Sequence, residues 1–161
     1  MSAPGNRRGF TIAELLVAMI IIGILAGIAV LKYVDLRRNA ITAKVASEIN
    51  AVKLAGYSYW GDNQSWPADA GAGVVPAGLV KHLPEGFRFD NPTWKYTLEW
   101  DNLGVVAGPG GSPPEYLIGI TIATTDARLM QKLESYLGTA APMFSYGGKL
   151  TYVIQAPGGG Y

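Results

Sequence analysis

Apolar and polar positions divide the chain into two parts near residue 60. Residues 10–31 are almost wholly apolar and contain one charged side chain, Glu14. From residue 32 to about residue 59, apolar residues recur at spacings of three, four or seven, with charged residues between them. That spacing places the apolar residues on one face of a helix. The pattern predicts one continuous helix of about fifty residues, apolar all round in its first half and amphipathic in its second.

The first half of this helix is long enough to cross a membrane. At about 1.5 Å per residue, residues 10–31 span roughly 33 Å, close to the thickness of a hydrocarbon core. No proline interrupts residues 10–66, and Gly61 with Pro67 provides a stop. The stripe predicted for the second half consists of Val34, Ile41, Val45, Ile49, Val52 and Ala55.

The residues after 61 read as a compact α+β unit. Residues 94–100 alternate between apolar and polar positions and predict a strand. One face of that strand carries Trp94, Tyr96, Leu98 and Trp100, and this aromatic stripe indicates core packing rather than a ligand platform. Residues 116–124 predict a second strand, which is apolar enough to be central in its sheet.

Further elements follow from local signals. Residues 76–84 suggest a short helical turn, and residues 126–137 predict an amphipathic helix capped by Thr125 or Asp126 and stopped by Gly138. Gly147-Gly148 predicts the turn of a hairpin between residues 143–146 and 149–155. The expected fold class is therefore α+β, with a long amino-terminal helix packed on a small antiparallel sheet of about four strands. The order of those strands does not follow from the sequence.

Composition narrows the classes of function. The chain has 161 residues, of which 49% are apolar and 16% charged, so it suits one globular domain plus a membrane element. Its formal net charge of +1 gives no reason to expect nucleic acid as a partner. It has no cysteine, which excludes disulfides, thiolate metal sites and a thiol nucleophile.

Three interpretations compete for the amino-terminal segment. A secretory signal peptide could be cut near residues 25–29, but its apolar region is usually shorter and lacks a carboxylate. A plain signal anchor fits the length but gives Glu14 no role. The third interpretation rests on the run RRGFTIAELLV at residues 7–17, which closely resembles the cleavage and methylation motif of type IV prepilins and type II secretion pseudopilins.

The resemblance implies a set of processing and assembly residues. In that family a membrane peptidase cuts after the glycine, which places the cut between Gly9 and Phe10 and makes Phe10 the N-methylated terminus. Glu14 matches the family's membrane-embedded glutamate, and Gly23 matches a glycine common in its helix. Leu31 departs from the pattern, since many members carry a proline there. The implied parts are a leader at residues 1–9, a long helix at 10–61 that is transmembrane over 10–31, and a pilin-like globular α+β domain at 62–161.

Two explanations remain open for Glu14. Thr11 and Glu14 have the spacing of a capping box, so the carboxylate could simply satisfy free amides at the helix start. The family implies instead that Glu14 faces the amino terminus at Phe10 of a neighbouring subunit. Such a pair would favour one axial stagger between subunits, because any other stagger leaves two buried charges unpaired.

The function that the resemblance implies is that of a structural filament subunit, preferably a type II secretion pseudopilin, and not an enzyme. Its partners would be pilin-like subunits, the prepilin peptidase, an inner-membrane assembly platform and, before assembly, membrane lipid. The family places the amino terminus in the cytoplasm and the carboxy-terminal domain in the periplasm, although the basic residues after the span argue for the reverse. The alternatives are a type IV or minor pilin for adhesion, motility or DNA uptake, and a membrane-anchored binding domain.

Other candidate chemistry is sparse. His82, the only histidine, is more typical of a surface residue than of a general base. Asp62, Asn63 and Asp69 suggest calcium, which some major pseudopilins bind, but the loop fails the EF-hand pattern and these residues also form ordinary turns. The sequence therefore predicts no catalytic residue, no metal site and no cofactor.

Overall fold

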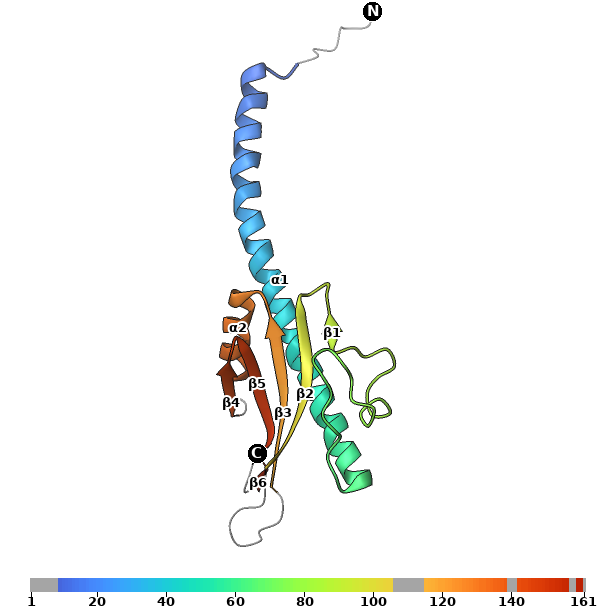
Figure 1. The fold of residues 1–161 in the computed structure, drawn as a ribbon. Helices are drawn as coiled ribbons and strands as arrows, with labels where there is room; N and C mark the ends of the chain where they lie inside the picture. Colours follow the sequence, from blue (N-terminus) through green and yellow to red (C-terminus); the bar gives the residue numbers. More distant parts are fainter. Residues whose placement is uncertain (1–8, 106–114, 139–141, 157–158, 161) are drawn as a thin grey trace, which may run out of the picture. The chain divides into compact units, whose positions relative to one another are not determined.

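The computed structural model describes residues 9–105, 115–138, 142–156 and 159–160. It contains a long helix, α1 (Ile12–Asn63), and a shorter one, α2 (Ala127–Leu137). The strands, shown with the helices in Figure 1, are β1 (Asp90–Asn91), β2 (Tyr96–Val105), β3 (Glu115–Thr124), β4 (Met143–Tyr146), β5 (Lys149–Ala156) and β6 (Gly159–Gly160). The chain forms two compact units, Met1–Arg38 and Asn39–Tyr161, and their boundary falls inside α1.

The described part of the first unit is the apolar half of α1. The helix that begins at Ile12 is long and apolar enough to cross a membrane. Every side chain from Phe10 to Leu31 is exposed within this single chain. Large apolar side chains on all sides of a helix need another apolar environment, either lipid or neighbouring helices.

The second unit is built on one antiparallel sheet with the strand order β1-β2-β3-β5-β4, and β6 pairs with β5. The apolar strand β3 lies in the middle, as its composition predicts. β2 pairs with β3 along its whole length, from Tyr96 opposite Thr124 to Val105 opposite Glu115. The sheet has more strands than the four expected, because β1 and β6 are two-residue pairings that carry no apolar pattern.

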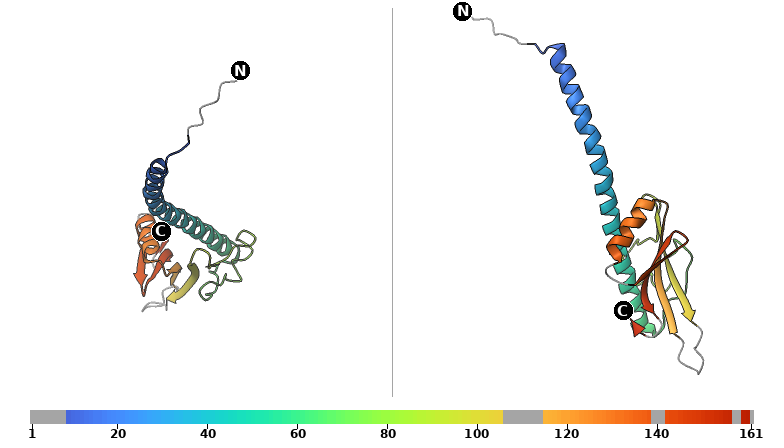
Figure 2. Two further views of the ribbon diagram at one scale, coloured as in Figure 1. Left: turned by 90° about the horizontal axis from the view of Figure 1, so that it is seen from above. Right: turned by 90° about the vertical axis from the view of Figure 1, so that its left-hand side faces the viewer.

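One face of the sheet packs against the second half of α1, as Figure 2 shows from two further sides. Of the predicted stripe, all members from Ile41 to Ala55 are buried, whereas Val34, which belongs to the first unit, is exposed. The strands contribute alternate residues, so that β2 buries Tyr96, Leu98 and Trp100. The helix α2 adds Leu129, Leu133 and Leu137 to the same core.

The short helical turn predicted at residues 76–84 is present as consecutive hydrogen-bonded turns, for example through Leu79 N–H to the Pro76 carbonyl at 2.9 Å and Leu83 N–H to the Leu79 carbonyl at 3.1 Å. The strand predicted at residues 94–100 differs from its prediction at its start. Trp94 is not part of a strand, because the turn before β2 continues to Lys95. The φ of Lys95 is +56°, so the extended conformation begins only after it. The alternation in the sequence begins two residues too early, since Trp94 is half-buried and packs against the core from that turn.

The predicted cap of α2 and the predicted hairpin turn between β4 and β5 are confirmed. Asp126 caps α2 by accepting hydrogen bonds from the amides of Arg128 at 3.0 Å and Leu129 at 3.2 Å. Gly147 and Gly148 join β4 to β5 with φ values of +59° and +77°, the positive pair that a two-residue hairpin turn requires.

Candidate functional site

The residues that the motif singles out lie at and just before the start of α1. Gly9 and Phe10 precede the helix, which begins at Ile12. Both are exposed, and the Phe10 side chain keeps 83% of its surface accessible. The peptide bond predicted to be cut therefore lies outside the helix, between two exposed residues.

Glu14 lies in the first turn of α1 and forms a capping box with Thr11. Its Oε2 atom accepts hydrogen bonds from the Thr11 amide and from the Thr11 hydroxyl, both at 2.9 Å. The Glu14 amide in turn donates to the Thr11 hydroxyl oxygen at 3.2 Å. This reciprocal arrangement satisfies amides at the helix start that would otherwise lack an acceptor. The capping role that the spacing suggests is thus present in the single chain.

The cap does not use the whole carboxylate. Both hydrogen bonds that the carboxylate accepts from Thr11 end on Oε2, and the side chain stays exposed along with the surrounding apolar surface. Capping and a contact with a neighbouring subunit can therefore coexist at Glu14.

The turn-rich segment after α1 is held by aromatic packing. The Trp66 ring lies 5.7 Å from the ring of Tyr57 and 6.3 Å from that of Trp100, measured between centroids. The carbonyl oxygen of the buried Pro67 accepts hydrogen bonds from the Trp100 indole at 3.3 Å and from the Asn102 amide group at 2.7 Å. This segment therefore serves as structure, joining the end of α1 to β2.

His82 and the calcium candidates do not form one site. His82 Nδ1 shares a 2.9 Å hydrogen bond with the Ser58 hydroxyl, and its Nε2 lies 3.9 Å from Asp62 Oδ2. The Asn63 amide group donates to the Tyr59 carbonyl at 2.9 Å, so it ends the helix rather than pointing into a loop. Within the described ranges, no three His, Asp or Glu side chains gather as metal ligands would.

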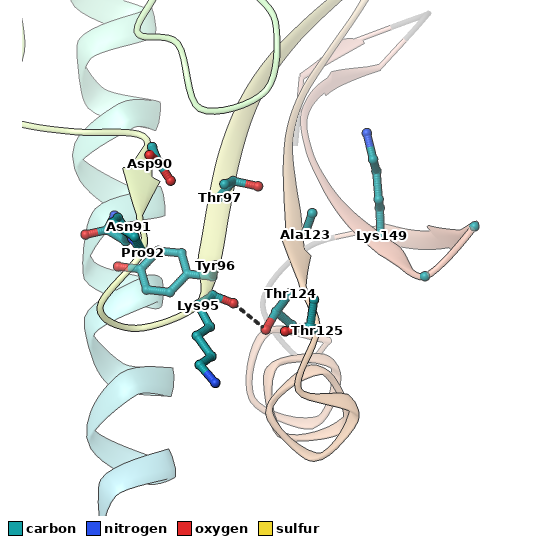
Figure 3. A pocket seen from close by; sticks show the side chains of 12 residues that line it. Asp90, Asn91, Pro92, Lys95, Tyr96, Thr97, Ala123, Thr124, Thr125 and Lys149 are labelled. Atoms are coloured by element: carbon teal, nitrogen blue, oxygen red, sulfur yellow. Dashed lines mark hydrogen bonds between the residues drawn. The ribbon is translucent and has the colours of Figure 1, made fainter.

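A hollow of about 500 Å³ lies where three connections meet, those between β1 and β2, β3 and α2, and β4 and β5 (Figure 3). The Thr124 hydroxyl donates to the Lys95 carbonyl at 2.8 Å and fixes that backbone in its left-handed conformation. The side chains of Lys95 and Lys149 extend in different directions, and Lys149 pairs with Glu99 at 3.0 Å. The polar groups thus serve the turns and do not converge on a reacting atom.

Sequence reasoning missed two polar networks in the second unit. The Tyr96 hydroxyl donates to Glu48 Oε2 at 2.6 Å, and Lys44 pairs with the same carboxylate. Burial, followed by the hydrogen bond to Glu48, raises the pKa of the Tyr96 phenol far above its usual range. The spacing of Lys44 and Glu48 is the ordinary one for a helical ion pair, but nothing in the sequence shows that β2 supplies the phenol.

The second network lies on the outer face of the sheet. The Thr121 hydroxyl donates to Asp101 Oδ2 and shares a 2.7 Å hydrogen bond with the Thr151 hydroxyl. Burial raises the pKa of Asp101 above its ordinary value, and although the Thr121 hydrogen bond opposes this, nearby Glu99 and Asp69 add to it. Asp101, Thr121 and Thr151 lie on the three adjacent strands β2, β3 and β5. The network therefore depends on the strand order, which the sequence does not reveal.

A long helix with an apolar first half and a second half packed on a small antiparallel sheet is the pilin-like arrangement. The capped glutamate at the start of that helix completes the features of this class.

Comparisons with known proteins agree with the class. Residues 4–30 match the model of the prokaryotic N-terminal methylation motif. Type II secretion system core protein G of Escherichia coli strain K12 is 36% identical over 113 residues, which are 68% of this chain and 78% of that protein. Fimbrial protein EcpC of Eikenella corrodens is 38% identical over 78 residues, 48% of this chain and 51% of the relative. A fimbrial protein of Pseudomonas aeruginosa is 40% identical over 52 residues, 32% of this chain and 34% of the relative. No solved structure matches the chain significantly.

The chain belongs to the family of type IV pilins and type II secretion pseudopilins. It is a pilin-like protein whose apolar amino-terminal helix and prepilin motif fit a membrane-anchored subunit.

Proposed function

We propose that this protein is a pseudopilin of a type II secretion system, a structural subunit and not an enzyme. The observation that carries the proposal is its similarity to core protein G, which extends over 78% of that protein and so includes much more than the amino-terminal motif. The fimbrial relatives match over half of their length or less. The absence of cysteine supports the same choice, because it removes the carboxy-terminal disulfide loop of many type IV pilins.

The precursor is processed at the start of α1. A prepilin peptidase cuts between Gly9 and Phe10, and the new terminus at Phe10 is N-methylated. The exposure of both residues before the first helical turn supports this step. The amino terminus lies on the cytoplasmic side of the inner membrane and the second unit on the periplasmic side, and an assembly platform in that membrane receives the subunit.

The processed terminus then takes part in assembly. The amino group of Phe10 in one subunit pairs with the Glu14 carboxylate of a neighbour, while Glu14 keeps its cap to Thr11 through Oε2. A carboxylate in a membrane helix costs about 2.5–3.5 kcal/mol at the bilayer centre and less near its edge. Pairing with a positive terminus offsets this cost, so the pair favours the filament over isolated subunits.

Two variants separate the pairing from the capping role. Glu14→Gln keeps a side-chain oxygen that can accept the Thr11 bonds but removes the charge, and we expect cleaved subunits that form no filament. Thr11→Ala removes the hydroxyl of the cap and keeps the charge, and we expect it to assemble. Leader cleavage is followed by gel mobility and assembly by electron microscopy of sheared filaments. Normal filaments from Glu14→Gln, or loss of assembly in Thr11→Ala alone, would contradict the pairing.

The fimbrial relatives favour a second candidate, a type IV or minor pilin. Deletion of the gene distinguishes the two. A pseudopilin deletion abolishes export of a secreted enzyme to the medium and leaves surface pili intact. Loss of surface pili with normal secretion would instead identify a pilin.

A further inference from the structure

The hollow of about 500 Å³ between the three connections has no role in the function proposed above. It lies entirely in the second unit. One side of it is a row of three residues that lie opposite one another on neighbouring strands, Thr97 of β2, Ala123 of β3 and Lys149 of β5 (Figure 3). The side chain in the middle of this row is only a methyl group, which leaves room above the sheet. The volume is within the range of about 300–1,000 Å³ that is typical of small-molecule sites.

The same row continues onto an exposed aromatic side chain. Tyr146 of the edge strand β4 lies opposite Lys149, so their Cβ atoms are on the same face of the sheet and about 5 Å apart. Tyr146 keeps 85% of its surface exposed, more than any other large apolar side chain described in the second unit. Phe144 lies two residues earlier on the same face and is also exposed. The edge strand thus presents two aromatic rings in a line that ends beside the hollow.

Besides the groups that hold the three turns, the hollow has polar side chains that the fold does not use. Among the described residues, the Asp90 carboxylate and the Lys95 ammonium have no hydrogen-bond or ion-pair partner, and both side chains are exposed. The Thr97 hydroxyl, which is half-buried, likewise has no partner in the described part of the chain. Lys149 pairs with Glu99, which balances its charge. The hollow therefore offers both donors and acceptors to a ligand, with no net charge.

These features point to one class of ligand, an uncharged saccharide. Each hydroxyl of a sugar donates and accepts hydrogen bonds, so one ring can bind the Asp90 carboxylate and the Lys95 ammonium together. The C–H faces of sugar rings pack on aromatic side chains, and the flat, exposed rings of Phe144 and Tyr146 provide such a surface. Because a strand is straight, the two rings suit an extended chain. A β-1,4-linked chain of glucose-type rings is extended and flat, whereas an α-1,4-linked chain is curved.

We propose that the hollow and the exposed aromatic side chains of β4 form a binding site for an uncharged, β-1,4-linked oligosaccharide. One sugar ring packs on Tyr146, and the next ring lies in the hollow with its hydroxyls bound to Asp90 and Lys95. The site rests on the fold of the second unit alone. It requires neither leader cleavage nor filament formation, so it stands or falls separately from the function proposed above.

The experiment uses the full chain in lipid nanodiscs, because many detergents are themselves glycosides. Cellotetraose and chitotetraose are the probes, and maltotetraose is the α-linked control. Isothermal titration calorimetry measures the affinity, with empty nanodiscs as the blank. We expect the two β-linked probes to bind with a Kd below about 1 mM and maltotetraose to bind at least about tenfold more weakly. Saturation-transfer NMR should show the ring C–H protons of the bound probe in contact with the protein.

Matched variants test the two parts of the site. Tyr146→Ala should weaken binding about tenfold, and Tyr146→Trp should keep it, because an aromatic face is what the sugar ring needs. Tyr136→Ala is the control, since Tyr136 is 58% exposed on α2 and does not line the hollow. It should bind like the parent chain.

Asp90→Ala tests the hollow itself and should also weaken binding about tenfold, because it removes a charged acceptor of hydrogen bonds. Asp90 and Tyr146 are both exposed, so the midpoint of denaturant unfolding should stay unchanged and show that each variant is folded.

Three outcomes would overturn the proposal. Absence of binding by both β-linked probes at millimolar concentration would exclude a saccharide site. Equal binding of maltotetraose would exclude the extended chain as ligand, and unchanged affinity in Tyr146→Ala and Asp90→Ala would place any binding elsewhere. If Tyr146→Ala instead separates copies of the chain that associate in larger discs, and no probe binds, the aromatic line is a contact between copies and not a sugar site.

Discussion

Glu14 caps the start of α1 together with Thr11 in the single chain, and we propose that it also pairs with a neighbouring subunit. The capping box explains why a carboxylate is tolerated at this point of an apolar helix, because two donors from Thr11 already surround it. It does not explain why the residue is charged, since a glutamine could cap as well. That difference makes the amide variant the informative one.

The Tyr96 hydroxyl offers a second test at the level of one residue. Tyr96→Phe should lower the free energy of unfolding by about 1.5–3 kcal/mol, because it removes the hydrogen bond that the Tyr96 hydroxyl donates to the charged Glu48 carboxylate. This hydrogen bond lies at the half-buried boundary between α1 and β2. Tyr57→Phe is the matched control, since its hydroxyl makes a longer hydrogen bond of 3.4 Å to the Ile154 carbonyl. Denaturant unfolding followed by tryptophan fluorescence measures both. Equal losses in the two variants would rule out a special role for the Glu48 network.

Asp101 predicts a dependence of stability on pH. Its pKa in the folded chain is raised above the ordinary value of 3.8, so the folded state binds the proton more tightly than the unfolded state. This contribution to stability is complete below about pH 3.8 and is lost as pH rises through the higher, folded pKa.

We therefore expect Asp101→Asn to raise the melting temperature at pH 7 and to have no such effect at pH 3. The exposed Asp90→Asn is the control for the change in net charge. A stabilisation of equal size at both pH values would mean that the ionisation of Asp101 is not the cause.

Among the elements, α1 shows why its glycines are not equivalent. A Cβ atom added at Gly56 would lie 2.7 Å from the fully buried Trp100 ring, whereas one added at Gly61 would meet nothing within 4 Å. Gly56→Ala should therefore destabilise the second unit by about 1–3 kcal/mol, because the ring cannot move without displacing the core. Gly61→Ala should stabilise the helix by up to about 1 kcal/mol. The midpoint of denaturant unfolding measures both, and a gain in Gly56→Ala would contradict the close packing.

Much at this level follows from the sequence, for identifiable reasons. The stripe from Ile41 to Ala55 and the alternation in β2 reflect periodicities that a helix and a strand impose on any buried face. Gly147-Gly148 and Asp126 signal their turn and cap through their own chemistry. The prediction that Trp94 belongs to the strand is wrong, because a residue that packs on the core can also lie in a turn. The strand β1 is not predicted, because two residues are too few to show an alternating pattern.

Some contacts of the functional residues can be predicted from the sequence and others cannot. Gly9, Phe10 and Glu14 lie close together in the sequence, so a local motif predicts them together. The contacts of Tyr96 with Glu48 and of Asp101 with Thr121 join residues far apart in sequence, and only the packing of α1 and the strand order bring them together. The hydrogen bond from the Lys132 ammonium to the Asn39 side-chain oxygen likewise requires that α2 lie beside Asn39.

For the whole molecule, the division into two units predicts that their stabilities are independent. All four tryptophans lie in the second unit, so their fluorescence reports its unfolding alone. Ile49→Ala should cost about 2–5 kcal/mol, since Ile49 is 1% exposed in the core. Ile24→Ala, at a side chain that is 61% exposed in the first unit, should leave the unfolding transition unchanged in detergent micelles. A comparable loss from both substitutions would show that the two units unfold together.

The central claim is that the chain is a processed filament subunit and not merely a tethered domain. Mass spectrometry of the amino-terminal peptide of the chain, purified from its native membrane, tests this most directly. The account predicts a mature chain that begins at Phe10 and carries a methyl group on its terminal nitrogen. An intact leader, or a cut near Ala29, would contradict it.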